Sequence, residues 1–125
     1  MGCRLIADSA AARTLFAPLA RERREVAAFA YLDPEWRLLG LRQTRGGDTA
    51  IEVSLRLITA DALAFDAAAM VMAHNHPGGD PTPSEADRAL TRRLARTLDA
   101  LDIRLLDHLV LAGDQVTSFR AMGLL

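Results

Sequence analysis

Two histidines and an aspartate have the residue types and spacing to bind a metal ion. His74 and His76 end an apolar run, and residues two apart in a strand face the same way, roughly 7 Å from each other. Both imidazoles can therefore lean toward one ion, such as zinc bound by nitrogen at about 2.0 Å. Asp87 would add a carboxylate from the next helix. Three protein ligands leave a fourth tetrahedral position open, as in catalytic zinc sites.

Each of these residues also has a structural explanation. A lone histidine is usually structural, and an H-x-H pair arises by chance often enough to prove little alone. Ser84 and Asp87, which follow Pro83, form an S-x-x-D capping box that needs no metal. Their joint placement favours the metal, because a strand end, a constrained loop and a helix N-terminus converge where α/β sheets usually place their sites.

The elements that must position these residues are the clearest in the sequence. Residues 68–74 form a short, uninterrupted apolar run, which predicts a central strand buried on both faces. Residues 77–83 contain three prolines and two glycines, which predicts a stiff loop. Residues 84–101 predict a helix, with its leucines on one stripe. The stripe comprises Leu90, Leu94, Leu98 and Leu101.

The remaining elements predict an α/β fold in a single domain over residues 1–125. We expect a helix over 9–20 after the N-cap Asp8-Ser9, within a helical extension of residues 1–24. Strands over 25–32 and 36–44 would form an antiparallel hairpin, broken by Gly46-Gly47-Asp48. A helix over 52–65 and closing strands over 103–112 and 115–119 complete a mixed β-sheet flanked by helices.

Composition narrows the function. The 125 residues are 50% hydrophobic and 25% charged, enough for one core. The net charge of −1 does not favour nucleic-acid binding, so the four arginines of the helix over 84–101 are expected to be a solvated face.

Cys3 is the single cysteine, which excludes an internal disulfide and a multi-thiolate zinc site. We see no secretory signal and no apolar run near 20 residues, so we expect a cytoplasmic chain without a membrane span.

These motifs also resemble a known family. His74-x-His76, seven residues, Ser84, two residues and Asp87 match the H-x-H-x7-S-x2-D signature of the JAMM (MPN+) metalloproteases. The longer string HNHPGGDPTPSEAD, with LLDHLVLAG downstream, resembles the RadC family in particular. The resemblance runs from about Arg24 to the C-terminus. It implies a JAB/MPN domain with a cytidine-deaminase-like three-layer architecture.

The resemblance also implies an activity and a role for each residue. The chain would be a zinc metallohydrolase that cleaves a peptide or isopeptide bond of a protein or peptide substrate, using water that the metal activates. His74, His76 and Asp87 would bind one Zn2+ per chain, and Ser84 would hydrogen-bond the oxyanion. Glu25, which opens EVAAFAYLD, would be the general base, with Glu22 as a weaker candidate.

The chain departs from the RadC pattern, and other functions stay open. Gly78 stands where the family commonly has serine, and no helix-hairpin-helix segment fits before residue 25. Asp107-His108 is expected to be structural, although a partner that orients a metal ligand is an alternative. The chain could instead be a non-catalytic MPN-type interaction module, or a DNA-repair accessory protein as the RadC name suggests. The literal triplet His74-Asn75-His76 is not the motif of HNH nucleases.

Overall fold

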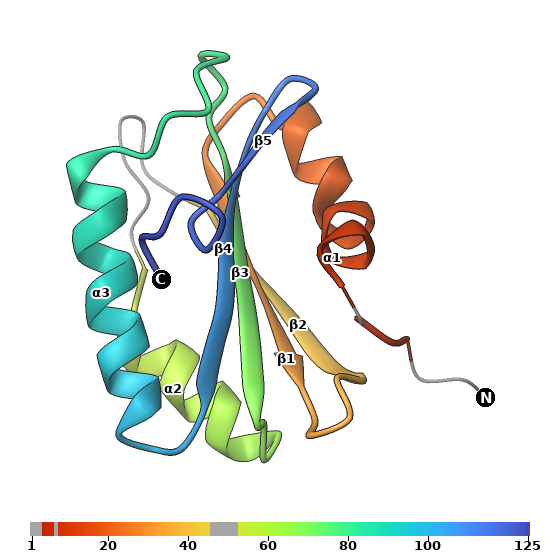
Figure 1. The fold of residues 1–125 in the computed structure, drawn as a ribbon, viewed down its shortest axis with the longest axis vertical. Helices are drawn as coiled ribbons and strands as arrows, with labels where there is room; N and C mark the ends of the chain where they lie inside the picture. The colour runs from red at the N-terminus through yellow and green to blue at the C-terminus, as the bar shows by residue number, and fades with distance from the viewer. Residues whose placement is uncertain (1–3, 7, 46–52) are drawn as a thin grey trace.

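The computed structural model describes residues 4–6, 8–45 and 53–125, and across these ranges one mixed sheet lies between two layers of helix (Figure 1). Helix α1 (Ser9–Phe16) and the 3-10 helix η1 (Ala17–Arg21) cover one face. Helices α2 (Leu55–Ala64) and α3 (Glu85–Asp99) cover the other. This arrangement confirms the predicted α/β class with a mixed sheet flanked by helices.

The sheet places its most apolar strands at its centre. Its order is β2-β1-β3-β4-β5. Strand β3 pairs antiparallel with β1 and parallel with β4, and every residue of β1 and β3 is buried. The central position predicted for the run over 68–74 is therefore confirmed, because helices cover both faces of that strand. The strands are β1 (Val26–Leu32), β2 (Leu38–Arg45), β3 (Ala69–Asn75), β4 (Arg104–Ala112) and β5 (Gln115–Ser118).

The pleat of the sheet divides the core into two clusters. In β1, Val26 and Ala28 pack toward α1 and η1, whereas Ala27 and Phe29 pack toward α2 and α3. The segment over 9–21 contributes to the core through Ala12, Phe16 and Leu19, which are 5%, 2% and 3% exposed. The same alternation continues through β3, so the end of this strand can present a side chain to the α3 side.

The first helix is shorter than predicted. It ends at Phe16 and continues as η1, because Pro18 lacks the N–H that an α-helix needs. Its expected cap is confirmed, since the Asp8 carboxylate accepts a hydrogen bond from the Ala11 N–H at 2.8 Å.

The hairpin forms as predicted, with a later start to its second strand. Strand β2 begins at Leu38, and Trp36 lies in the turn with a φ of 66°. The turn is held by the Asp33 carboxylate, which accepts from the N–H groups of Glu35 and Arg37. The predicted break at Gly46-Gly47-Asp48 lies outside the described residues.

Helix α2 also differs from its predicted bounds. The predicted start at residue 52 lies outside the described residues, and Ser54 caps the helix by accepting from the Leu57 N–H at 3.2 Å. Phe65 lies just beyond the helix and stacks on Tyr31, with ring centroids 5.3 Å apart. Within the described part of the chain, no helix combines the length and apolar character that crossing a membrane requires.

A partly buried polar contact attaches α2 to the sheet. The Asp61 carboxylate accepts from Arg42 Nε at 2.6 Å and Nη2 at 2.9 Å, and from the Tyr31 hydroxyl at 3.0 Å. The hydrogen bonds from Arg42 hold the pKa of Asp61 below its ordinary value. Burial, followed by the bond to Asp61, raises the pKa of Tyr31. The ionised carboxylate therefore contributes to stability.

We expect Asp61→Ala to lower the free energy of unfolding by about 1–3 kcal/mol, because the buried Tyr31 hydroxyl loses its acceptor. Asp61→Asn should cost less, since its amide oxygen still accepts. The folded-state pKa of Asp61 lies below the unfolded value, so its contribution is present above the unfolded pKa and is lost as the pH falls through the folded one. Urea unfolding should show that the gap in free energy of unfolding between wild type and Asp61→Asn narrows as the pH falls from about 7 to about 3. A gap that stays constant with pH, or an equal effect in the exposed control Asp99→Asn, would contradict this.

Candidate metal centre

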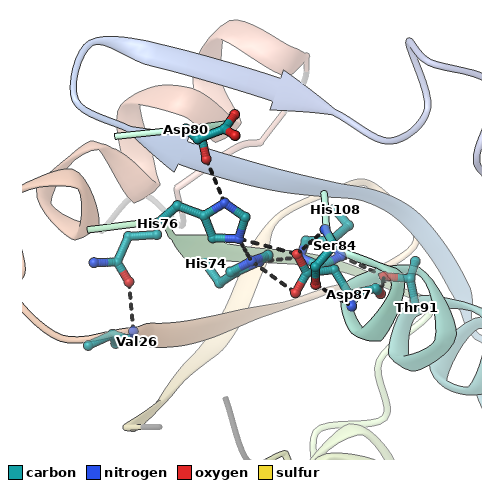
Figure 2. Close-up of polar contacts among 9 residues, drawn as sticks. Val26, His74, His76, Asp80, Ser84, Asp87, Thr91 and His108 are labelled. Atoms are coloured by element: carbon teal, nitrogen blue, oxygen red, sulfur yellow. Dashed lines mark hydrogen bonds and ion pairs between the residues drawn. The ribbon is translucent and has the colours of Figure 1, made fainter. Parts of the chain in front are cut away.

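The parallel crossover from β3 through α3 to β4 brings the predicted ligands to one end of the sheet. His74 is the penultimate residue of β3. His76 follows the strand, and its N–H donates to the Leu111 carbonyl at 2.8 Å, which keeps this residue beside β4. The loop over 77–83 then returns the chain to α3, whose first turn carries Asp87. Figure 2 shows the three side chains pointing toward one another.

The geometry of the three side chains suits one metal ion. One ligand atom of each lies within 4.8 Å of the others. His74 Nε2 is 2.9 Å from His76 Nε2 and 3.3 Å from Asp87 Oδ1, and His76 Nε2 is 3.2 Å from Asp87 Oδ2. Ligands that surround a tetrahedral ion at about 2.0–2.1 Å are roughly 3.3 Å apart. The observed spacing is therefore close to that of ligands around a single ion.

The hydrogen bonding of His76 favours a ligand role for its Nε2. Its Nδ1 lies 2.7 Å from the backbone carbonyl oxygen of Asp80. A carbonyl only accepts, so Nδ1 carries the hydrogen, and the Nε2 of the neutral ring has a free lone pair. This lone pair faces the cluster, where a metal would be bound.

Asp87 serves the helix and the cluster together. The capping box forms as predicted: Ser84 Oγ accepts from the Asp87 N–H at 3.0 Å, and Asp87 Oδ2 accepts from the Ser84 N–H at 2.8 Å. Burial by itself would raise the pKa of Asp87, but the neighbouring His74 and the bonds from Ser84 outweigh burial and hold this pKa well below its ordinary range. The carboxylate is therefore ionised, as a ligand of a dication must be.

Glu25 lies outside the sheet, one residue before β1, rather than in the strand as predicted. Asn75, between the two histidines, holds this segment in place. Its side chain accepts from the Val26 N–H at 2.7 Å and donates to the carbonyls of Glu22 at 3.0 Å and Arg24 at 2.9 Å. Sequence reasoning missed this role of Asn75, although an amide in a buried strand signals a need for partners.

A cavity of about 720 Å³ joins the cluster to the other predicted site residues. Glu25 and Ser84 line it beside His76 and Asp87, so the structure brings all five predicted residues to one region. Glu22, the weaker candidate base, is 4.0 Å from Arg45 in an exposed ion pair. The cavity is lined by Glu25, Val53, His76, Pro77, Gly78, Asp80, Ser84, Ala86, Asp87, Leu90 and Arg93.

His108 belongs to this site, whereas Asp107 is structural as expected. Asp107 accepts hydrogen bonds from the Ser118 hydroxyl at 2.6 Å and the Arg120 N–H at 3.0 Å. The fully buried His108 places Nε2 2.6 Å from His74 Nδ1. Burial, and then the proximity of His74, lowers the pKa of His108 well below its ordinary value. Local sequence gives no sign of this contact, because 34 residues separate the two histidines.

Comparison with known proteins gives the same family over most of the chain. Residues 6–124 match the RadC-like JAB domain. The chain is 43% identical to UPF0758 protein YfjY of Escherichia coli over 103 residues, which cover 82% of this chain and 64% of that protein. It is 42% identical to a UPF0758 protein of Thiobacillus denitrificans over 120 residues, which cover 94% of this chain and 54% of that protein. The chain thus spans between about half and two thirds of the length of these relatives.

We expect the chain to bind one divalent ion and His76→Ala to abolish this binding. His76 lies beyond the end of β3 and is only partly buried, so removal of its side chain should leave the metal-free protein folded. A metal at 100 times its dissociation constant should stabilise the wild type by about 2.7 kcal/mol. Calorimetric titration and thermal unfolding, with and without chelator, measure both effects.

Asp80→Asn is the matched control for this experiment. Asp80 lines the same cavity, but it contacts His76 through its backbone carbonyl, which the substitution retains. Binding by His76→Ala with wild-type affinity would remove His76 from the ligand set.

Proposed function

The chain belongs to the RadC-like JAB domain family, and on this premise we propose that it is a zinc-dependent metallohydrolase that cleaves peptide or isopeptide bonds. One observation supports this proposal above the others. The cluster of His74, His76 and Asp87 opens on a cavity that also contains a carboxylate and a hydroxyl suited to amide hydrolysis. A purely structural metal site would not need these two groups.

The donor set is well suited to zinc. Two imidazole nitrogens and one carboxylate are a common ligand set of catalytic zinc sites, and they leave a position open to the cavity. A bound zinc ion would lower the pKa of water toward about 7 and polarise a substrate carbonyl. The protein holds the imidazoles and the carboxylate in place before the ion arrives, so little order has to be created on binding.

We assign proton transfer to Glu25. Glu25 lines the cavity one residue before β1, on a segment that three hydrogen bonds to Asn75 hold against the His74–His76 strand end. In amide hydrolysis the attacking water loses a proton and the departing amine gains one. A single carboxylate can accept the first proton and deliver the second, which balances the reaction and returns Glu25 to its starting state.

We assign stabilisation of the oxyanion to the Ser84 hydroxyl. Its oxygen accepts from the Asp87 N–H, which orients the side chain at the start of α3. A hydroxyl that accepts through its oxygen still has its own hydrogen to donate. That hydrogen can therefore bond to a substrate carbonyl oxygen as it gains negative charge, and such a donor costs no reorganisation during the reaction.

The proposed substrate is a protein or a peptide. The cavity combines apolar walls from Val53, Ala86 and Leu90 with the charged side chain of Arg93, which suits an amide flanked by mixed side chains. The chain has no lysine, since arginine supplies all 15 of its basic residues. An isopeptide bond to a lysine would therefore have to lie outside these 125 residues.

The decisive experiment measures cleavage of peptide and isopeptide libraries by the zinc-loaded chain. Glu25→Gln should keep one zinc per chain and lower turnover by about 10²–10⁴-fold, because it removes the proton carrier but no ligand. Glu22→Gln is the matched control and should keep its activity, since Glu22 pairs with Arg45 at the surface. Undiminished turnover in Glu25→Gln would exclude Glu25 from its role. A zinc-loaded wild type that binds but never cleaves peptides would favour an interaction module, and DNA binding with a steep salt dependence would favour the accessory role.

A second pair of variants separates the proposed role of the Ser84 hydroxyl in catalysis from its role as the N-cap of α3. Ser84→Ala and Ser84→Gly should each lower kcat by about 10²–10³-fold, because both lose the donor to the oxyanion. Their stabilities should differ, since alanine at an N-cap costs about 1 kcal/mol and glycine only a few tenths. Steady-state kinetics and urea unfolding measure the two effects. If turnover fell further in Ser84→Ala than in Ser84→Gly, in line with their stabilities, Ser84 would act only as a capping residue.

A further inference from the structure

A series of hydrogen bonds connects α3 to the Nδ1 atom of His74, whereas the Nε2 atom of the same ring faces the other two candidate metal ligands. The Thr91 hydroxyl donates to the Asp87 carbonyl at 2.7 Å and lies 2.7 Å from His108 Nδ1. His108 Nε2 in turn lies 2.6 Å from His74 Nδ1. Figure 2 shows these side chains in sequence, between α3 and the end of β3. His74 and His108 are fully buried, and Thr91 is 1% exposed.

The direction of every hydrogen bond in this series follows from the first one, which joins the Thr91 hydroxyl to the Asp87 carbonyl. The Asp87 carbonyl can only accept, so the single hydrogen of the Thr91 hydroxyl is used there. Toward His108 the hydroxyl must therefore accept, which places a hydrogen on His108 Nδ1. His108 is buried and stacked on Phe119, with ring centroids 4.3 Å apart. These surroundings favour a neutral ring with one hydrogen, so its Nε2 accepts from His74 Nδ1.

We propose that Thr91 and His108 are positioning residues that hold the hydrogen of His74 on Nδ1 and so keep the lone pair of its Nε2 for the metal. This inference rests on the metal site of the proposed function. His108 is not a ligand itself, because the nitrogen nearest to the cluster is already the acceptor of the His74 N–H. Partners that orient a ligand in this way commonly set both the tautomer and the affinity of a metal site.

The proposal determines which electron pairs the two histidine ligands direct toward the space between them. The Asp80 carbonyl holds the hydrogen of His76 on its Nδ1, and the Thr91–His108 chain does the same for His74. Both Nε2 atoms then present lone pairs to each other at 2.9 Å. Two lone pairs repel at this distance unless a cation lies between them. The hydrogen bonds behind the two rings therefore prepare the site for a positive ion.

The alternative arrangement is also defined by the structure. If His74 carried its hydrogen on Nε2, it could donate to His76 Nε2 at 2.9 Å or to Asp87 Oδ1 at 3.3 Å, and its Nδ1 would have to accept from His108. The His108 hydrogen would then lie on Nε2, and its Nδ1 would compete with the Asp87 carbonyl for the one hydrogen of Thr91. The Thr91 hydroxyl thus decides between the two arrangements.

The test determines which ring nitrogen of His74 carries hydrogen in the metal-free chain, by nitrogen-15 NMR of the imidazoles. The chain has 3 histidines, so the spectrum is simple to assign. We expect His74 Nδ1 to be protonated in the wild type. Thr91→Val has nearly the same shape but no hydroxyl, and it should shift the His74 hydrogen toward Nε2. Thr91→Ser restores the hydroxyl and should restore the wild-type pattern.

Zinc affinity provides an independent readout, measured by competition with a chromophoric chelator. Thr91→Val should bind zinc about 10–100-fold more weakly than the wild type, and Thr91→Ser close to the wild type. His108→Gln should retain more affinity than His108→Phe, because an amide oxygen near the position of Nε2 can still accept from His74. Near-ultraviolet circular dichroism of each metal-free variant reports whether its core is intact.

The outcomes are distinguishable from those of the proposed function. An unprotonated His74 Nδ1 in the wild type would overturn the inference, even if zinc binds. So would a Thr91→Val protein whose tautomer and zinc affinity match those of Thr91→Ser. A wild type that binds no zinc but has the expected tautomer would refute the proposed function and still support the hydrogen-bond assignment.

Discussion

The convergence of three electron-pair donors at one end of the sheet is the constraint on which the structure depends. With the lone pairs of both Nε2 atoms directed inward, two imidazole nitrogens 2.9 Å apart and a carboxylate beside them repel one another unless a cation joins them. The surrounding chain opposes their separation. His74 belongs to a strand that is buried on both faces, His76 is bonded to β4 and to Asp80, and Asp87 is held by its own helix cap. The fold therefore maintains a local arrangement that the ligands alone would not adopt.

The Asp87 carboxylate takes part in both the capping box and the group of candidate metal ligands, and the two roles are compatible. Asp87 Oδ2 accepts from the Ser84 N–H and also faces His76, while Oδ1 faces His74. A helix N-terminus stabilises negative charge, so the cap keeps the carboxylate ionised and aimed at the cluster. A structural explanation of Ser84 and Asp87 is thus correct and does not compete with a functional one.

Polar side chains in the buried strands connect the parts of the site. Asn75 joins the segment of Glu25 to the strand end that carries both histidines, and His108 joins that strand end to α3 through Thr91. Each amide or imidazole here has partners, as buried polar groups must. The residues of the site come from segments at β1, β3, α3 and β4. They keep their relative positions because the contacts between these segments lie in the core, where side chains have little freedom.

Local patterns in the sequence were enough to predict much of this protein. The spacing of His74, His76 and Asp87, the capping box and the central apolar strand are local features, since each depends on residues within a turn, a loop or a strand. Some element boundaries differ from the predicted ones, because Pro18 converts the end of the first helix to 3-10 geometry and Trp36 lies in a turn. The tertiary structure alone decided the contacts of Asn75, Thr91 and His108, which join residues up to 53 positions apart. Such contacts leave no periodic signal, because they arise only when the sheet register and the packing of α3 bring distant polar atoms together.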